Sequence, residues 1–364
     1  MTHERYHRQS LLPGWDQARL ANANVIIMGM GALGNAVAQA LALAGVGRMV
    51  LCDPDTIDAT NLCRTPLFDA GDLGRFKVDA AAATLARIAP ETRIDARADA
   101  LEFAVGLAEI RDADLVLGCL DSNAARLELA GRCALVGAPW VDGATGPWSG
   151  EVRPWLDPDG PCFACGLDDA GRAANDGALS CRVPAAPDRM GATAPLSLWV
   201  GAQMAMMAVR YLMGLPVVPG ILVQDGLSGT VDRVQPIRDP DCPLHRRLPA
   251  PRASALSHRA TVAQFLEELR NELGPDVQPL AWQRFQTGPQ CRRCGYIATS
   301  LTGRITPEST ASYCPVCVNP IRTRTHLTLA NAPPEMPLQA LGVAPREILA
   351  VRVGDALHYY ELSA

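Results

Sequence analysis

The sequence predicts an α/β protein in which a doubly wound, mostly parallel sheet is followed by a small α+β module. Two observations predict this fold class. Short apolar runs alternate with helical patterns from residue 24 onward, which is typical of parallel βαβ units. Pairs of cysteine or histidine residues then recur near the end of this pattern and beyond it. We therefore expect a first domain at residues 1–248, a linker at 249–257 and a C-terminal module at 258–364.

The first βαβ unit carries a glycine motif. The apolar runs Asn24–Met28 and Arg48–Cys52 are suited to two buried parallel strands. Glycines between them allow a tight turn and a helix start that presents free N–H groups to a phosphate. Asp53 follows the second run, where a carboxylate can accept hydrogen bonds from ribose hydroxyls. This unit predicts a Rossmann-like nucleotide-binding fold, and its motif glycines are Gly29, Gly31 and Gly34.

Strands and helices continue to alternate after Asp53. We expect helices at Lys77–Ile88 and Asn123–Val136, and strands at Arg93–Arg97, Asp114–Cys119 and from Trp140–Val141 onward. The most apolar long stretch, residues 194–213, contains Gln203 and Arg210, so we interpret it as a buried helix rather than a membrane span. Ligands of such sheets bind at the carboxyl ends of the strands. Asp121, like Asp53, follows such an end.

Charged residues separate this sequence from a nicotinamide-dependent dehydrogenase, which shares the glycine motif. A dinucleotide has two phosphates and needs few cations. A triphosphate with magnesium needs several positive groups and a carboxylate for the metal. The residues that supply this set are Arg8, Arg64, Lys77 and Asp121. Their presence favours ATP and Mg²⁺ as cofactors.

With these motifs, residues 5–245 resemble the ThiF/MoeB family, whose adenylating domain is shared with ubiquitin-activating enzymes. The resemblance implies that Asp53 binds the ribose and that Asp121 binds Mg²⁺. It implies that the phosphates are bound by Asn61, Arg64 and Lys77. It also implies that Arg8 reaches the ATP of a partner subunit, which makes the protein a homodimer.

The ATP site expected from the motifs and the resemblance comprises Gly29, Gly31, Ala32, Gly34, Asp53, Asp55, Asn61, Arg64, Lys77, Asp121 and Asn123. Two residues depart from the family pattern. Ala32 stands where glycine is usual, and Cys63 stands where glutamine is usual. The methyl group of Ala32 predicts either tighter packing near the nucleotide or an altered affinity for it, and we expect neither departure to abolish activity.

The reaction that the resemblance implies is acyl adenylation. A carboxylate, typically the C-terminal glycine of a ubiquitin-like protein, attacks the α-phosphate of ATP and pyrophosphate leaves. Because both reactants are negative, catalysis needs charge neutralisation and alignment more than a general base. In the resembling family, a cysteine of the crossover loop can then accept the acyl group as a thioester. Cys181, in the expected crossover loop at 167–193, is the candidate, and Arg182 and Arg189 can lower its pKa.

Two sets of cysteines predict structural zinc sites. The spacing C-x2-C-x19-C-x2-C of the second set is typical of a zinc ribbon. In the first set the last ligand is a histidine, and a closed shell of four ligands leaves no place for a catalytic water. The expected ligands are Cys162, Cys165, Cys242 and His245 in the first site, and Cys291, Cys294, Cys314 and Cys317 in the second.

The C-terminal module reads as one helix with several strands. Thr261 and Gln264 match a capping box at the start of an amphipathic helix that ends at Gly274-Pro275. Strand-like runs follow at Leu280–Phe285, Ile297–Leu301 and Thr323–Leu329, and a hairpin spans residues 347–362. This order is compatible with a β-grasp-like domain of the kind that recruits a conjugating enzyme in ubiquitin-activating enzymes.

Composition excludes several classes of protein. The net charge is −5, which argues against a general nucleic-acid binder. The charged start of the sequence does not resemble a signal peptide. Without a secretory signal, twelve cysteines are metal ligands, catalytic groups or small core residues rather than disulfides. We therefore expect a cytoplasmic protein with no membrane segment.

Three hypotheses about function remain. In the first, the protein activates a ubiquitin-like protein for a bacterial-type conjugation pathway, through an adenylate and a Cys181 thioester. In the second, it is an adenylyltransferase for a sulfur-carrier protein, a peptide or a small carboxylate, and forms no thioester. In the third, it is a catalytically silent scaffold, against which the set of Arg8, Arg64, Lys77 and Asp121 argues.

Overall fold

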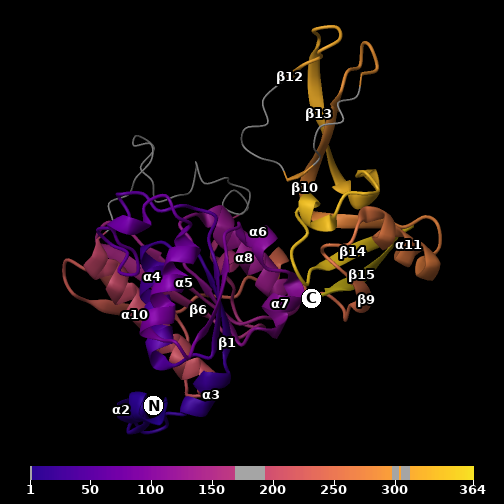
Figure 1. The fold of residues 1–364 in the computed structure, drawn as a ribbon. Coiled ribbons are helices and arrows are strands. Elements are labelled where there is room, and N and C mark those ends of the chain that lie inside the picture. Colours follow the sequence, from indigo (N-terminus) through magenta and orange to yellow (C-terminus); the bar gives the residue numbers. More distant parts are fainter. Residues whose placement is uncertain (1, 169–192, 297–302, 305–311) are drawn as a thin grey trace. The chain divides into compact units, whose positions relative to one another are not determined.

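The computed structural model describes residues 2–168, 193–296, 303–304 and 312–364. The chain divides into two compact units (Figure 1). The N-terminal unit comprises Met1–Leu101 and Ile110–Arg247, and the C-terminal unit comprises Glu102–Glu109 and Leu248–Ala364.

One eight-stranded sheet organises the N-terminal unit, in the order β3-β2-β1-β4-β5-β6-β7-β8. The first five strands of this order are parallel, which confirms the predicted doubly wound sheet. The last three add antiparallel pairings that the sequence did not reveal. The strands are β1 (Asn24–Met28), β2 (Arg48–Cys52), β3 (Arg93–Arg97), β4 (Leu115–Gly118), β5 (Trp140–Thr145), β6 (Ser149–Trp155), β7 (Ile221–Asp225) and β8 (Val231–Val234).

Helices cover both faces of this sheet (Figure 1). Helices α4 (Ala32–Ala44), α5 (Lys77–Ile88) and α10 (Ala194–Leu212) share one apolar core with the strands, and α8 (Asn123–Val136) lies on the other face. The side chain of Thr193 caps α10, which confirms the helix expected at residues 194–213. In the described part of the chain, no helix combines the length and apolarity needed to cross a membrane. The shorter helices are α1 (Thr2–Arg5), α2 (His7–Ser10), α3 (Gln17–Asn22), α6 (Leu101–Ala104) and α7 (Leu107–Asp112).

The order of strands places a switch point at β1. The chain runs from β1 to β2 on one side, and β4 then pairs with β1 on the other side. The loops that follow β1 and β4 therefore leave the sheet next to each other. This edge of the sheet carries the candidate site described below.

The C-terminal unit is built on a mixed sheet with the order β12-β13-β10-β14-β15-β9, and β11 pairs with β10. Helix α11 (Val262–Leu273) contributes Phe265 and Leu269 to its core, and both halves of the capping box of Thr261 and Gln264 are present. The hairpin at the chain end is confirmed. The strands are β9 (Arg252–Ser257), β10 (Gln278–Gln290), β11 (Gly303–Arg304), β12 (Ser312–Tyr313), β13 (Pro320–Thr328), β14 (Ile348–Val353) and β15 (Ala356–Ser363).

Residues 102–109 belong to the C-terminal unit although the segments on both sides of them belong to the N-terminal unit. The backbone N–H of Gly106 donates to the Pro345 carbonyl at 3.0 Å. The N–H of Leu107 donates to the buried carboxylate of Glu347 at 3.0 Å. A Cβ at Gly106 would lie 2.3 Å from the Pro345 carbonyl oxygen, so only glycine allows this approach.

Part of the segment expected to link the two domains is a strand of the C-terminal sheet. The linker expected at 249–257 is wrong for residues 252–257, because these residues form β9, which pairs in parallel with β15. Their short, polar sequence lacks a strand pattern, and the partner strand lies about a hundred residues later. The strand expected at Ile297–Leu301 lies outside the described residues, and the β-grasp comparison stays a prediction.

Candidate active site

Three glycines shape the loop between β1 and α4, each for a different reason. Gly29 has a φ of +93°, and a Cβ there would lie 2.4 Å from the Cys119 carbonyl oxygen in the loop after β4. A Cβ at Gly34 would lie 1.9 Å from the Gly29 carbonyl oxygen. Gly31, the N-cap of α4, has a negative φ, and among the described residues other than its chain neighbours no atom lies within 4 Å of such a Cβ. The fold therefore does not need glycine at 31, which leaves open space beside the helix N-terminus for a ligand.

This difference predicts opposite results for two alanine substitutions. Gly34→Ala should lower the free energy of unfolding by about 3 kcal/mol, since its methyl group collides with backbone. Gly31→Ala should change stability by less than about 1 kcal/mol but weaken ATP binding about tenfold or more, because its methyl group enters the phosphate space. Urea denaturation and isothermal titration with Mg-ATP measure the two effects. Unaltered ATP affinity in Gly31→Ala would place the phosphates elsewhere.

The Asp53 carboxylate holds this loop in place. It is buried, and it accepts hydrogen bonds from the Met30 N–H at 2.6 Å and the Asp55 N–H at 2.8 Å. Burial raises the pKa of the Asp53 carboxyl, and the positive charge of Lys77 opposes this shift. Asp53 therefore fixes the glycine loop through backbone N–H groups, and the ribose contact implied by the resemblance would use its remaining acceptor capacity.

Lys77 stands beside Asp53, at the first residue of α5. Its Nζ lies 2.6 Å from a carboxylate oxygen of Asp55 and 3.9 Å from Asp53 Oδ1. The Lys77 side chain is 12% exposed, whereas that of Asp55 is 65% exposed. The Lys77–Asp55 pair can thus open at little cost when a phosphate competes for the ammonium group.

Asn61 and Arg64 lie on the turn that leads to Thr65. The Asn61 carboxamide oxygen accepts from the Asp58 N–H at 3.1 Å, and Arg64 Nη1 donates to the Thr60 carbonyl at 2.5 Å. A residue that sequence reasoning missed connects this turn to the glycine loop. Buried Asn35 donates to the Met30 and Gly31 carbonyls and accepts from the Leu67 N–H. The sequence feature that could have revealed Asn35 is a polar residue on the buried face of an otherwise apolar helix.

The loop after β4 carries Asp121, whose side chain is exposed. Buried Arg126 of α8 braces this loop, because it donates to the Leu120 carbonyl and lies 3.4 Å from the Asn123 carboxamide oxygen. Arg126 also pairs with the fully buried carboxylate of Asp142, which Arg153 contacts at 2.6 Å. Losing one partner of such a buried network costs several kcal/mol, so the loop position is strongly specified.

The structure does not bring Arg8 to this site within one chain. Arg8 is exposed on α2, next to Tyr6, and the Tyr6 ring packs against Gly45. Gly45 ends α4, whereas the glycine loop begins it. A helix of 13 residues is about 20 Å long, so Arg8 could serve an ATP site only in another copy of the chain.

Comparison with known proteins extends these observations. The pattern that defines the ThiF family matches residues 6–244, which span the sheet, the glycine loop and the polar residues around it. The chain belongs to the ThiF family. This membership confirms the resemblance drawn from the motifs.

Some relatives in this family match the chain over nearly their whole length. Molybdopterin-synthase adenylyltransferase of Escherichia coli (strain K12) is 36% identical over 247 residues, which cover 65% of this chain and 94% of the relative. Sulfur carrier protein adenylyltransferase of Thermus thermophilus is 32% identical over 251 residues, which cover 66% and 90%. A crystal structure of E. coli MccB shares the fold, with a TM-score of 0.57 and 21% identity over 68% of this chain and 74% of that chain.

The first set of expected zinc ligands of this ThiF-family chain is assembled in the N-terminal unit. The sulfurs of Cys162 and Cys165 are 3.7 Å apart, as are those of Cys162 and Cys242, and Cys165 Sγ lies 3.1 Å from His245 Nε2. All four ligand atoms lie within 4.8 Å of one another. Such a set fits a tetrahedral zinc ion, which would tie the segment after β6 to the segment after β8.

The second set is assembled in the C-terminal unit. The sulfurs of Cys291 and Cys317 are 3.4 Å apart, and those of Cys294 and Cys314 are 3.5 Å apart. Four cysteine sulfurs within 4.8 Å of one another suit a structural zinc site. The ribbon has a small apolar core in which Ile321 packs against Cys291 and Cys314.

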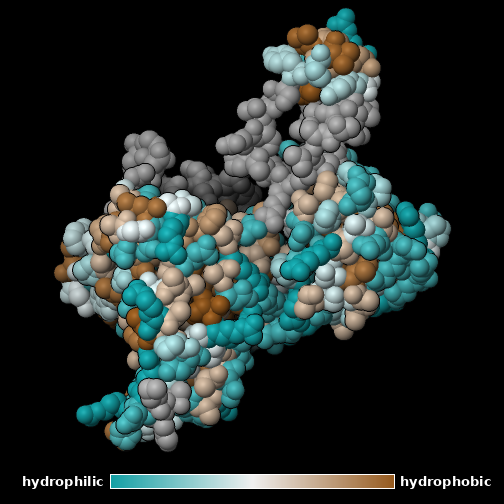
Figure 2. All heavy atoms as spheres, viewed as in Figure 1, coloured by the Kyte–Doolittle hydropathy of each residue, from teal (hydrophilic) through white to brown (hydrophobic). Residues whose placement is uncertain are grey.

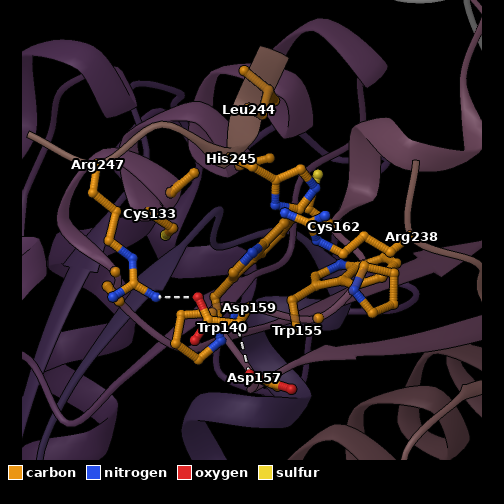
Figure 3. Close-up of a pocket in the computed structure, with 17 residues that line it drawn as sticks. Cys133, Trp140, Trp155, Asp157, Asp159, Cys162, Arg238, Leu244, His245 and Arg247 are labelled. Carbon is orange, nitrogen blue, oxygen red and sulfur yellow. Dashed lines mark hydrogen bonds and ion pairs between the residues drawn. The ribbon is translucent and has the colours of Figure 1, made fainter. Parts of the chain in front are cut away.

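A pocket of about 60 Å³ borders the first cluster at Cys162 and His245 (Figure 3). Trp140 and Trp155 line it, and Arg247 donates to Asp159 at 2.9 Å at its edge. This volume holds one or two waters, whereas nucleotide pockets usually exceed about 300 Å³. The pocket is therefore not a second candidate for the ATP site.

The remaining cysteines divide by burial. Cys52, Cys119 and Cys133 are buried, as expected for small core residues, and burial strongly raises the thiol pKa of the latter two. Cys63 is exposed on the turn with Arg64, whose Nη1 lies 3.9 Å from its sulfur. Cys181 and the rest of the crossover loop at 169–192 lie outside the described residues.

Proposed function

We propose that the protein is an ATP- and Mg²⁺-dependent adenylyltransferase that activates the C-terminal carboxylate of a small sulfur-carrier-type protein. One observation carries the proposal. The glycine loop, the Asp53–Lys77 pair and the Asp121 loop meet at one edge of the sheet, within a match that covers 94% of a molybdopterin-synthase adenylyltransferase. The relatives favour the second hypothesis of the sequence analysis over thioester-dependent conjugation.

In this proposal each residue has a physical task. The N–H groups at the start of α4 and the cations Lys77 and Arg64 bind the phosphates and neutralise their charge. Asp121 would hold Mg²⁺, which supplies charge stabilisation on the phosphate oxygens when bound. Arg126 keeps the Asp121 loop in position.

The chemical step joins a carboxylate oxygen of the carrier protein to the α-phosphorus of ATP. The bond from that phosphorus to the oxygen bridging to the β-phosphate breaks, and the electron pair leaves with pyrophosphate. No proton needs to move, since the attacking carboxylate is already ionised at neutral pH. A site that is rich in cations and poor in histidine suits this reaction. Arg8 of a second copy would add one more cation, as the family resemblance implies.

The proposal is tested with small proteins that end in glycine and are encoded by the same genome. ATP–pyrophosphate exchange, a non-reducing gel and intact mass are measured for wild type and Cys181→Ala. We expect exchange that persists in Cys181→Ala, with no thiol-sensitive adduct. An adduct that disappears in Cys181→Ala would instead establish the conjugation hypothesis. Failure to bind Mg-ATP, together with a lack of exchange for every candidate, would favour the scaffold hypothesis.

The C-terminal unit has no assigned role in this reaction. Its zinc ribbon and its mixed sheet lie beyond the family match, which ends at residue 244. Recruitment of a conjugating enzyme by this unit would require the conjugation hypothesis, so the adduct experiment also tests it.

A further inference from the structure

We propose that the end of the zinc ribbon is a docking surface for an acidic protein segment with apolar anchor residues. We call this surface the ribbon tip and define it by Arg292, Arg293, Tyr313, Val316 and Val318. The inference goes beyond the proposed function and does not depend on it. Three observations carry it: a strained residue, an exposed apolar cluster and a local excess of positive charge.

The two zinc knuckles have the same backbone geometry. In the first, the Gly295 N–H donates to the Cys291 carbonyl at 3.0 Å, and the Cys291 N–H donates to the Tyr296 carbonyl at 2.8 Å. In the second, Val318 and Asn319 make the equivalent bonds with Cys314, at 2.9 and 2.8 Å. Both knuckles need a left-handed residue directly after their second cysteine.

The second knuckle uses a residue that resists this conformation. Gly295 has a φ of +77° and Val318 a φ of +59°. A β-branched residue in the left-handed region is strained, and glycine at 318 would remove the strain. Val318 is 74% exposed, so packing within the chain does not explain why valine is present. Strain that stability does not explain points to a use of the side chain.

Val318 belongs to an exposed apolar cluster. Val316 is 66% exposed and Tyr313 is 67% exposed, and both flank the second knuckle. Figure 2 shows apolar and hydrophilic side chains next to one another at this end of the ribbon. Tyrosine and arginine are enriched in protein interfaces, in which apolar side chains form the centre and polar or charged side chains form the rim.

The charge of the ribbon selects the partner. Arg292 and Arg293 are exposed between the ligands of the first knuckle. The sequence from 291 to 324 contains five arginines and one glutamate, although the whole chain has a net charge of −5. An acidic partner is therefore attracted, and a basic one is repelled. Among the residues that define the ribbon tip, Tyr313 is the single aromatic side chain. Proteins that bind single-stranded nucleic acid stack successive bases on several aromatic side chains, so the ribbon tip favours an acidic protein segment.

The first test is an unbiased selection. A display library of random peptides is selected on the full zinc-loaded chain and counter-selected on Arg292→Glu/Arg293→Glu. We expect enriched peptides that combine Asp or Glu with large apolar residues. Enrichment of basic or neutral peptides, or of none that distinguishes the two chains, would overturn the proposal.

The second test separates docking from folding. The best peptide is titrated by fluorescence anisotropy against wild type, Val318→Gly and Val316→Ser. We expect Val318→Gly to bind the peptide about fivefold or more weakly while it releases zinc to a chelator more slowly, because its knuckle is no longer strained. Unchanged peptide affinity in Val318→Gly would overturn the proposal, whatever its zinc release.

Two controls complete this experiment. If Val318→Gly loses zinc as well as the peptide, Val316→Ser decides, since it removes an exposed apolar group without a change at a strained position. Weaker binding by zinc-loaded Val316→Ser then supports the proposal, and unchanged binding overturns it. A short single-stranded RNA that displaces the peptide and binds tighter than it would also overturn the proposal, in favour of nucleic acid.

Discussion

Asp121→Asn is expected to reduce ATP–pyrophosphate exchange about 100-fold or more, without a change in stability. The carboxylate is the group that would hold Mg²⁺, and an amide carries no charge with which to do so. The Asp121 side chain is exposed, and no partner in the described part of the chain depends on it. Its loss should therefore shift the free energy of unfolding by less than about 0.5 kcal/mol.

Exchange assays over a range of Mg²⁺ concentrations measure this effect, together with thermal unfolding. Asp232→Asn is the matched control, because Asp232 is an exposed carboxylate on β8, which is the last strand of the same sheet and is separated from β4 by three other strands. It should retain the activity of the wild type. Near-normal exchange in Asp121→Asn would show that Mg²⁺ is not held by Asp121 or by the loop that Arg126 braces.

Cys242→Ser is expected to halve the zinc content, from two ions per chain to one, and to lower the melting temperature by roughly 10 °C or more. Cys242 is buried, and its sulfur lies 3.7 Å from the sulfur of Cys162. A structural zinc ion contributes several kcal/mol to folding, and each kcal/mol shifts the melting temperature of a unit of this size by about 2–4 °C. The segments after β6 and β8 would lose the link between them.

Elemental analysis and differential scanning calorimetry measure zinc content and melting temperature. Cys63→Ser serves as the control, because Cys63 is an exposed cysteine outside both clusters. It should keep both ions and the wild-type melting temperature. A wild-type chain that is purified with no metal and melts unchanged with a chelator would contradict both zinc sites.

Local signals in the sequence predicted several elements of both units correctly. The strand Asn24–Met28, the helix Lys77–Ile88 and the capping box at Thr261 have the residues that these elements require on their own, so the structure agrees with them. β9 and the antiparallel strand β8 lack such signals. They become strands because a partner strand from elsewhere in the chain pairs with them, which no short window of sequence shows.

In the candidate site, too, some residues could be recognised from local sequence and others could not. Gly29, Asp53, Lys77 and Asp121 stand at recognisable positions relative to strands and helices. Asn35 and Arg126 escaped notice because their importance lies in what they touch: carbonyl groups of loops that precede or follow them in the chain. Residue type alone did not reveal these contacts.

Because residues 102–109 belong to the C-terminal unit, the N-terminal unit cannot be separated simply by ending the chain after it. A chain that ends at Arg247 would retain the whole family match, yet Val105, Leu107 and Ala108, which are fully buried in the intact protein, would lose their surroundings. Glu347 would no longer accept from Leu107. We therefore expect that the region matching the family does not fold by itself in this protein. A shortened chain would need new side chains in segment 102–109 before it could be produced alone.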